Sequence, residues 1–182
     1  VSCIYNGISL PAGVSYDNPF SHIEGYQGKV LCIARLAPPK RVDLFLKVAS
    51  LLPQYAFIWV GNLEVVNMEY TSNVYFMGNI SNAGIYNKFV DLFMLASDYE
   101  GLPIVIIEAL ACGKPVVASA VGGISELLNG KNGFAVHNDA EEMAKKIDNI
   151  LSDKKLKEEM EDAARQTYLQ KFTVDKMVDS YM

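Results

Sequence analysis

Residues 100–117 read EGLPIVIIEALACGKPVV, a run that is apolar apart from two glutamates, Glu100 and Glu108, and one lysine. Pro103 suits the first turn of a helix, so the segment predicts a loop, then a helix, then a short apolar strand over 114–120. A loop, a helix and a strand in this order form the repeating unit of an α/β domain. The stretch also raises a question, because Glu108 lies among apolar residues where a solvated charge has no obvious place.

The same unit recurs along the chain. Short, mostly apolar runs occur at 29–36, 55–61, 74–78, 90–97, 114–120 and 133–137. Runs of this length that do not alternate strictly are expected for strands covered on both faces. Helical patterns lie between them, and the part after residue 138 has the pattern of two amphipathic surface helices and a last short one. The sequence therefore predicts an α/β fold, a Rossmann-like doubly wound parallel sheet of about six strands with helices on both faces and C-terminal helices appended.

Composition narrows the function. The chain has 182 residues and a net charge of −5, which argues against nucleic acid as the main partner because a phosphate backbone requires a basic face. The three cysteines, Cys3, Cys32 and Cys112, match no metal template, and we interpret them as reduced, buried thiols of a cytoplasmic protein. No apolar run approaches the roughly 20 residues that span a bilayer. The chain begins with Val1, and we expect a piece of a longer protein.

Ligands of such sheets bind outside the carboxyl ends of the strands, so the residues just after each strand matter most. Arg35 and Lys40 follow the first predicted strand, and Glu100 follows the fourth. The EGLP loop that leads into a helix favours a phosphate, through free backbone N–H groups and the helix dipole. Neither a Walker loop nor a GxGxxG fingerprint is present.

Glu108 would lie about a turn and a half into that helix. Its neighbours on the same helical face are Ile104, Ala111 and Cys112, and an unpaired buried carboxylate costs several kcal/mol. The carboxylate therefore needs an internal cation, backbone donors, or the paired hydroxyls of a ligand. A ribose diol fits this demand, since a hydrogen bond to a charged acceptor contributes roughly 1.5–3 kcal/mol.

The pattern SxxEGxPxxxxEAxAxGxPVVxSxxGGxxE, over residues 97–126, resembles the nucleotide-sugar-binding half of family 4 retaining glycosyltransferases of GT-B fold. Glu100 and Glu108 match the family's pair of glutamates separated by seven residues. The resemblance extends to the Arg35 and Lys40 pair and over nearly the whole chain. Two departures are visible, because Ala34 and Arg41 stand where the family often has glycine, and VGNLE lacks a second glycine after the second strand.

The resemblance implies roles for individual residues. Glu100 would be the catalytic residue that contacts hydroxyls of the donor sugar near the reacting carbon. Arg35 and Lys40 would hold the diphosphate, and Glu108 the ribose hydroxyls. The remaining donor-binding residues would line the sugar and phosphates, namely Gly101, Leu102 and Ile104, or the base, namely Gly78, Asn79 and Ile80. No metal and no cofactor are expected, and the partner would be a nucleotide sugar such as a UDP- or GDP-sugar.

The resemblance also implies an organisation. Residues 1–28 would form a linker, 29–171 the Rossmann-like donor-binding domain, and 172–182 a helix that returns toward a missing N-terminal domain. The function implied is transfer of a sugar with retention, in cell-surface polysaccharide, teichoic acid or glycolipid synthesis. We expect this fragment alone to be inactive, and the full-length protein to be cytoplasmic, with membrane contact at the inner face.

Three alternatives stay open. A glycoside hydrolase would also use two carboxylates, but it ranks low because Glu108 belongs to an apolar helix rather than to an open cleft. A non-catalytic nucleotide-binding or interaction module would keep the phosphate loop and lose the sugar-contacting carboxylate. A nucleotide-sugar epimerase of the same two-domain fold is disfavoured by the EGLP segment. The sequence leaves open the base, the sugar, the acceptor and the linkage.

Overall fold

A computed structural model describes residues 5–9, 15–63 and 66–181. Its centre is one sheet of six parallel strands in the order β3-β2-β1-β4-β5-β6. The strands are β1 (Lys29–Ile33), β2 (Ala56–Val60), β3 (Val74–Phe76), β4 (Leu92–Leu95), β5 (Val116–Ser119) and β6 (Gly133–Val136). All six predicted strands are present, so the predicted fold class is confirmed.

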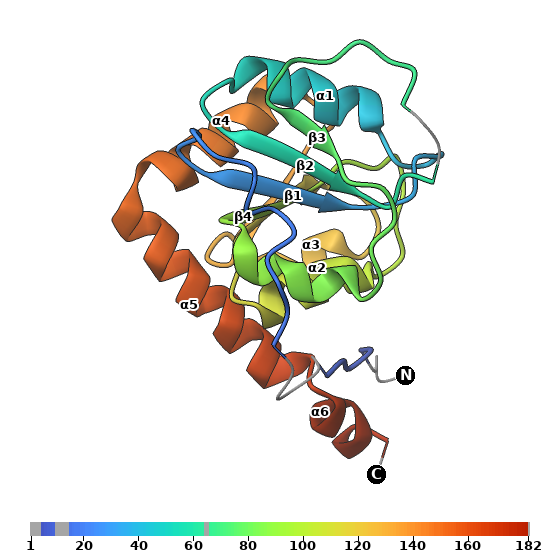
Figure 1. Cartoon of the computed structure of the whole chain (residues 1–182). Helices are drawn as coiled ribbons and strands as arrows, with labels where there is room; N and C mark the ends of the chain where they lie inside the picture. The colour runs from blue at the N-terminus through green and yellow to red at the C-terminus, as the bar shows by residue number, and fades with distance from the viewer. Residues whose placement is uncertain (1–4, 10–14, 64–65, 182) are drawn as a thin grey trace.

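Helices cover both faces of the sheet (Figure 1). They are α1 (Val42–Leu51), the 3-10 helix η1 (Ala83–Phe89), α2 (Ile104–Ala111), α3 (Ile124–Leu127), α4 (Ala140–Ser152), α5 (Lys154–Lys171) and α6 (Val174–Asp179). The α1 and α4 helices pack together on one face, whereas α2 packs with η1 and α5 on the other. This arrangement explains why the strands are apolar throughout, since every residue of β2, β4 and β5 is buried.

The C-terminal helices begin where capping side chains stand. Asp139, Asp153 and Thr173 each accept a hydrogen bond from a backbone N–H in the first turn of α4, α5 and α6. The buried residues of α4 follow one stripe, at Met143, Ile147 and Ile150, as an amphipathic surface helix requires. The predicted helical end of the chain is therefore confirmed.

Two local features differ from the sequence prediction. The η1 helix is absent from the prediction, because residues 83–89 contain no apolar stripe long enough to indicate an α-helix. It follows Asn82, whose backbone is left-handed, with φ of 55°. The α3 helix, predicted to extend to Gly130, ends at Leu127 after a single turn.

The burial of the cysteine thiols agrees only in part with the sequence prediction. Cys32 is buried and free, as expected, but Cys112 is only half-buried. Cys3 lies outside the described residues. Within the described part of the chain, no helix is both long enough and apolar enough to cross a bilayer.

The segment before β1 joins the domain at two places. Phe20 and Ile23 belong to the hydrophobic core, with exposures of 0% and 1%. Ile8 pairs with the end of α5, where its N–H donates to the Phe172 carbonyl at 2.9 Å and its carbonyl accepts from the Tyr168 hydroxyl at 2.9 Å. The boundaries predicted at residues 28 and 171 stay a prediction.

Strands β1 and β4 are neighbours although β2 and β3 come between them in sequence. Connections leaving their carboxyl ends therefore run to opposite sides, which opens a crevice between the two loops. The loop after β1 carries Arg35 and Lys40, and the loop after β4 carries Glu100. Sheet topology thus brings together side chains that are about 60 positions apart in sequence.

Candidate functional site

A pocket of about 640 Å³ occupies this crevice. Six of the ten predicted site residues line it: Arg35, Lys40, Asn79, Glu100, Leu102 and Ile104. Ile33, Ala34, Gly61, Leu63, Pro103 and Val105 complete the wall and were not predicted. Gly78, Ile80, Gly101 and Glu108 are not among the lining residues, although each is next to one in sequence or one helical turn away.

The loop after β1 is fixed to the end of β4 by backbone pairing. Lys40 and Ser97 form an antiparallel bridge, in which the Arg41 N–H donates to the Ala96 carbonyl at 3.0 Å. The Asp98 N–H donates to the Pro39 carbonyl at 2.9 Å. The two loops therefore form one unit, and the position of Lys40 depends on the position of Ser97.

The Lys40 ammonium and the Glu100 carboxylate form an ion pair inside the pocket. Both side chains are largely buried, with exposures of 20% and 11%. The Ser97 hydroxyl donates to the same Glu100 oxygen, Oε1, at 2.6 Å. A bound anion would therefore compete with Glu100 for Lys40 and would leave the carboxylate free to accept ligand hydroxyls.

The two arginines of this loop differ in role. Arg35 is exposed at the mouth of the pocket and has no ion-pair partner among the described residues. Arg41 is bound on both sides, by Asp43 at 2.7 Å and by Asp98 at 3.0 Å. Arg35 is thus available to an anion, whereas Arg41 holds the loop.

Glu108 projects from the second turn of α2, four residues after Ile104, so both lie on one helical face. The carboxylate is half-buried and makes no hydrogen bond or ion pair with any described residue. Burial raises the pKa of the Glu108 carboxyl above its usual range. A partly desolvated carboxylate that has no partner in the described part of the chain and lies one turn from the pocket is suited to accept hydrogen bonds from a ligand.

Gly84 of η1 provides the space that Glu108 occupies. A β-carbon at position 84 would lie 2.5 and 2.6 Å from the two Glu108 carboxylate oxygens, well inside van der Waals contact. No pattern in the sequence indicates this contact, because η1 was not predicted. Gly84 is therefore a candidate site residue that was not predicted from the sequence.

Glycines also allow close approach between the loops of the site. The Gly61 N–H donates to the Gly78 carbonyl at 2.7 Å, and the Gly78 N–H donates to Asn62 Oδ1 at 2.9 Å, which places Asn79 at the pocket. Gly122 has a φ of 53°, and a β-carbon there would collide with the Glu100 carbonyl oxygen. The loop after β5 therefore packs directly against the backbone of Glu100.

The start of α2 opens onto the pocket, since Pro103, Ile104 and Val105 all line it. The first N–H groups of a helix have no partner within the helix, and they carry its positive end. Together with Lys40 and Arg35 they make the crevice attractive to phosphate groups. Within the residues that the structure describes, no group of three or more His, Cys, Asp or Glu side chains could hold a metal ion.

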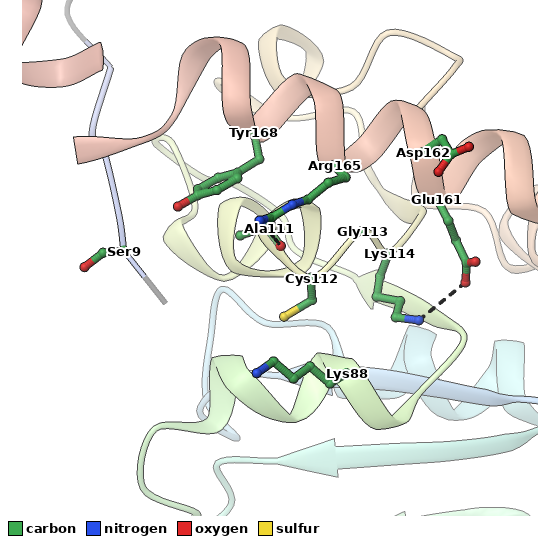
Figure 2. Close-up of a pocket in the computed structure, with 10 residues that line it drawn as sticks. All are labelled: Ser9, Lys88, Ala111, Cys112, Gly113, Lys114, Glu161, Asp162, Arg165 and Tyr168. Atoms are coloured by element: carbon green, nitrogen blue, oxygen red, sulfur yellow. Dashed lines mark hydrogen bonds and ion pairs between the residues drawn. The ribbon is translucent and has the colours of Figure 1, made fainter. Parts of the chain in front are cut away.

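A second pocket, of about 590 Å³, lies at the far end of α2 against α5 (Figure 2). Its cations mostly serve the fold, because Arg165 donates to the Ala111 carbonyl and Lys114 pairs with Glu161 at 3.4 Å. Figure 2 shows Lys88 and Cys112 facing the same space from η1 and the end of α2. Burial raises the pKa of the Cys112 thiol to about 11, so this thiol is protonated at neutral pH.

Comparison with known proteins identifies the family of the chain. Residues 17–167 match the family described as "Glycosyl transferases group 1". The O-antigen biosynthesis glycosyltransferase WbnH of Escherichia coli is 36% identical over 157 residues, which cover 81% of this chain and 46% of the relative. An N-acetylgalactosaminyltransferase acting on N,N'-diacetylbacillosaminyl-diphospho-undecaprenol, from Campylobacter jejuni, is 33% identical over 78% of this chain and 40% of its own.

Solved structures share the fold. Anabaena HepE, crystallised with UDP-glucose, superposes with a TM-score of 0.74 at 27% identity and covers 84% of this chain and 46% of its own. A C-terminal domain of a group 1 glycosyltransferase from Francisella tularensis superposes with a TM-score of 0.74 at 19% identity, and the match covers 90% of this chain and 95% of that one. The chain spans about half the length of the curated relatives it matches. On the extent of these matches, the chain belongs to the group 1 glycosyltransferases.

Proposed function

We propose that this chain is the donor-binding half of a retaining glycosyltransferase that moves a sugar from a nucleotide-diphosphate sugar to an acceptor. One observation carries the proposal. The crevice between β1 and β4 combines two cations, Arg35 and Lys40, with the Glu100 carboxylate, and one helical turn from its wall Glu108 adds a carboxylate that has no partner among the described residues. Cations suit a diphosphate, and carboxylates suit the hydroxyls of ribose and sugar.

In the proposed reaction, an acceptor oxygen forms a bond to the anomeric carbon of the donor. The bond from that carbon to the diphosphate oxygen breaks, and the nucleoside diphosphate leaves with the bonding electrons. The acceptor loses its hydroxyl proton to the leaving diphosphate or to solvent. Lys40, Arg35 and the start of α2 would stabilise the charge that develops on the diphosphate. Glu100 would hold the sugar, and Glu108 the ribose.

Names of relatives favour a role in surface glycans. An O-antigen enzyme and an enzyme acting on a diphospho-undecaprenol substrate are both similar to this chain over most of its length. We therefore propose synthesis of a cell-surface polysaccharide or glycolipid, carried out by the whole protein on the cytoplasmic side of the membrane. HepE in complex with UDP-glucose supports a UDP-sugar as the donor.

Titration calorimetry of this chain with UDP, GDP, ADP and CDP tests the proposal. One nucleoside diphosphate should bind, and Lys40→Ala and Glu108→Ala should each weaken binding by about tenfold or more, since each loses a charge-assisted contact. Lys47→Ala and Glu141→Ala are matched controls, because both side chains are exposed on helices away from the pocket. Absence of binding by all four nucleotides at millimolar concentration, in this chain and in the full-length protein, would refute the proposal.

The same titration, extended to UDP-glucose, distinguishes the proposed donor site from a non-catalytic module that binds nucleotide alone. A module that binds nucleotide alone should bind UDP and UDP-glucose equally, whereas a donor site should show a contribution from the sugar that Glu100→Ala removes. The prediction that this chain alone transfers no sugar stays a prediction. Release of UDP from UDP-glucose with transfer to an acceptor by the isolated chain would contradict it.

A further inference from the structure

A closed ring of hydrogen bonds joins three strand ends behind the Lys40–Glu100 pair. The Ser97 N–H donates to Ser119 Oγ at 2.9 Å, and the Ser119 hydroxyl donates to Asn138 Oδ1 at 2.5 Å. Asn138 closes the ring, because its Nδ2 donates to the Ser97 carbonyl at 3.0 Å. Both backbone polar groups of Ser97 are therefore held by side chains, one from the end of β5 and one from the loop after β6.

Ser97 passes this constraint to the pocket in two ways. Its hydroxyl donates to Glu100 Oε1 at 2.6 Å, and its backbone pairs with Lys40. The ion pair between Lys40 and Glu100 then closes a second loop of contacts. A shift of the Ser97 backbone would consequently move both charged side chains of the site.

The ring of hydrogen bonds rigidifies the strand ends, and its side chains do not line the pocket. Ser97 and Ser119 have an exposure of 0%, and buried hydrogen-bond networks that are fully satisfied fix one geometry. Neither Ser119 nor Asn138 lines the pocket. Asn138 is exposed at the surface, yet both ends of its amide point into the ring.

Capping of α4 does not account for Asn138. The N-cap of α4 is Asp139, whose carboxylate accepts from the Glu142 N–H at 2.8 Å. Asn138 makes one more contact, from Nδ2 to Asp98 Oδ1 at 3.4 Å, and that aspartate also holds Arg41. Asn138 therefore contacts the segment after β4 directly, at Ser97 and Asp98, and through Ser119, which itself binds Ser97.

We infer that Asn138 and Ser119 are positioning residues of the donor site, which act through Ser97 to hold Glu100 against the donor sugar and Lys40 against the diphosphate. The inference rests on the proposed function for the identity of the ligand. It extends the site to the end of β6, the strand farthest from β3 in the sheet. It also gives a role to Asn138, an exposed residue that does not belong to the segment between Glu100 and Glu108.

The test uses this chain with UDP and UDP-glucose as probes. It measures the ratio of the affinity for UDP-glucose to the affinity for UDP, which reports the contribution of the sugar. Misplacing Glu100 weakens its charge-assisted hydrogen bond to a sugar hydroxyl, so Asn138→Ala should lower this ratio by about tenfold. Glu100→Ala should lower the same ratio. In the Glu100→Ala background, Asn138→Ala should leave the ratio unchanged, because the side chain through which it acts is gone.

Asn129→Ala is the matched control. Asn129 is also an exposed loop asparagine that binds two backbone groups, the N–H of Lys131 and of Asn132, but it lies before β6, at the opposite end of that strand from Asn138. Its substitution should leave the affinity ratio unaltered. An unchanged ratio in Asn138→Ala, or an equal fall in the presence and absence of Glu100, would overturn the inference.

A measurement without ligand separates this inference from the proposed function. Chemical unfolding of Asn138→Ala, Glu100→Gln and the double variant gives a double-mutant cycle. Coupling through Ser97 predicts that the double variant changes the unfolding equilibrium constant by less than the product of the single effects. If no nucleotide binds to this chain or to the full-length protein, the proposed function fails, and the cycle still decides the positioning role. Independent effects in the cycle would refute that role.

Discussion

Gly84 offers the sharpest test of Glu108, because its replacement moves the carboxylate without removing it. A β-carbon at position 84 would lie 2.5 and 2.6 Å from the carboxylate oxygens of Glu108, whereas ordinary contact begins near 3.4 Å. The carboxylate of a Gly84→Ala variant must therefore shift by about 1 Å, a displacement large enough to break hydrogen-bond geometry. The atoms that would be displaced are the far end of a flexible side chain, so the backbone can stay in place.

The variant should separate binding from stability. Loss of one hydrogen bond to a charged acceptor, about 1.5–3 kcal/mol, predicts a fall in nucleotide affinity of about 10- to 150-fold. Folding should not suffer, since the backbone of Gly84 lies outside the left-handed region and alanine reduces the entropy of the unfolded chain by about 0.4–1 kcal/mol. We therefore expect weaker binding together with equal or higher free energy of unfolding.

Calorimetry with UDP and urea unfolding followed by Trp59 fluorescence would measure the two effects. Trp59 is the only tryptophan and is fully buried, so its emission reports loss of the core. Gly28→Ala is the control, because a β-carbon there would make only ordinary contacts of 3.5 Å. Wild-type affinity in Gly84→Ala would refute the reasoning, and so would a further loss on adding Glu108→Ala.

Three other outcomes can be measured. Burial raises the folded-state pKa of Glu108, so the free energy of unfolding should fall as pH rises from about 4.3 through that higher pKa. The fall should be less than about 1 kcal/mol, because the side chain is half-exposed. Glu108→Gln should remove the fall in urea titrations from about pH 4 to 7. Gly122→Ala should destabilise the chain by about 1–3 kcal/mol, because its β-carbon would meet the Glu100 carbonyl; a change under about 0.5 kcal/mol would count against that contact. Cys112, with a pKa of about 11, should react with iodoacetamide at pH 7.5 a few hundred-fold more slowly than an ordinary thiol, and rapid labelling in peptide maps would contradict its burial.

The sequence predicted the sheet well because its information is local. Each strand is a short apolar run covered on both faces, so β1 and β5 could be recognised without knowledge of their neighbours. The alternation of strands and helices also predicted a parallel sheet, whereas the strand order β3-β2-β1-β4-β5-β6 came only from the structure. The site at the ends of β1 and β4 followed from the general rule for doubly wound sheets.

Contacts between distant loops were beyond sequence reasoning. Nothing in residues 83–89 indicates that Gly84 cradles a carboxylate 24 positions away, because the contact depends on how η1 packs against α2. The ring of Ser97, Ser119 and Asn138 is likewise formed only when three strand ends meet. Polar residues in loops look alike in sequence, and their partners are decided by tertiary packing.

The ion pair of Lys40 and Glu100 has a consequence for discrimination among anions in the cell. Orthophosphate bound at Lys40 would compete with Glu100 for the ammonium, and it offers the carboxylate few donors in return. A ligand that carries a diphosphate and sugar hydroxyls together can satisfy both partners at once. We therefore expect the Lys40–Glu100 ion pair to favour a ligand that carries both groups over a simple anion.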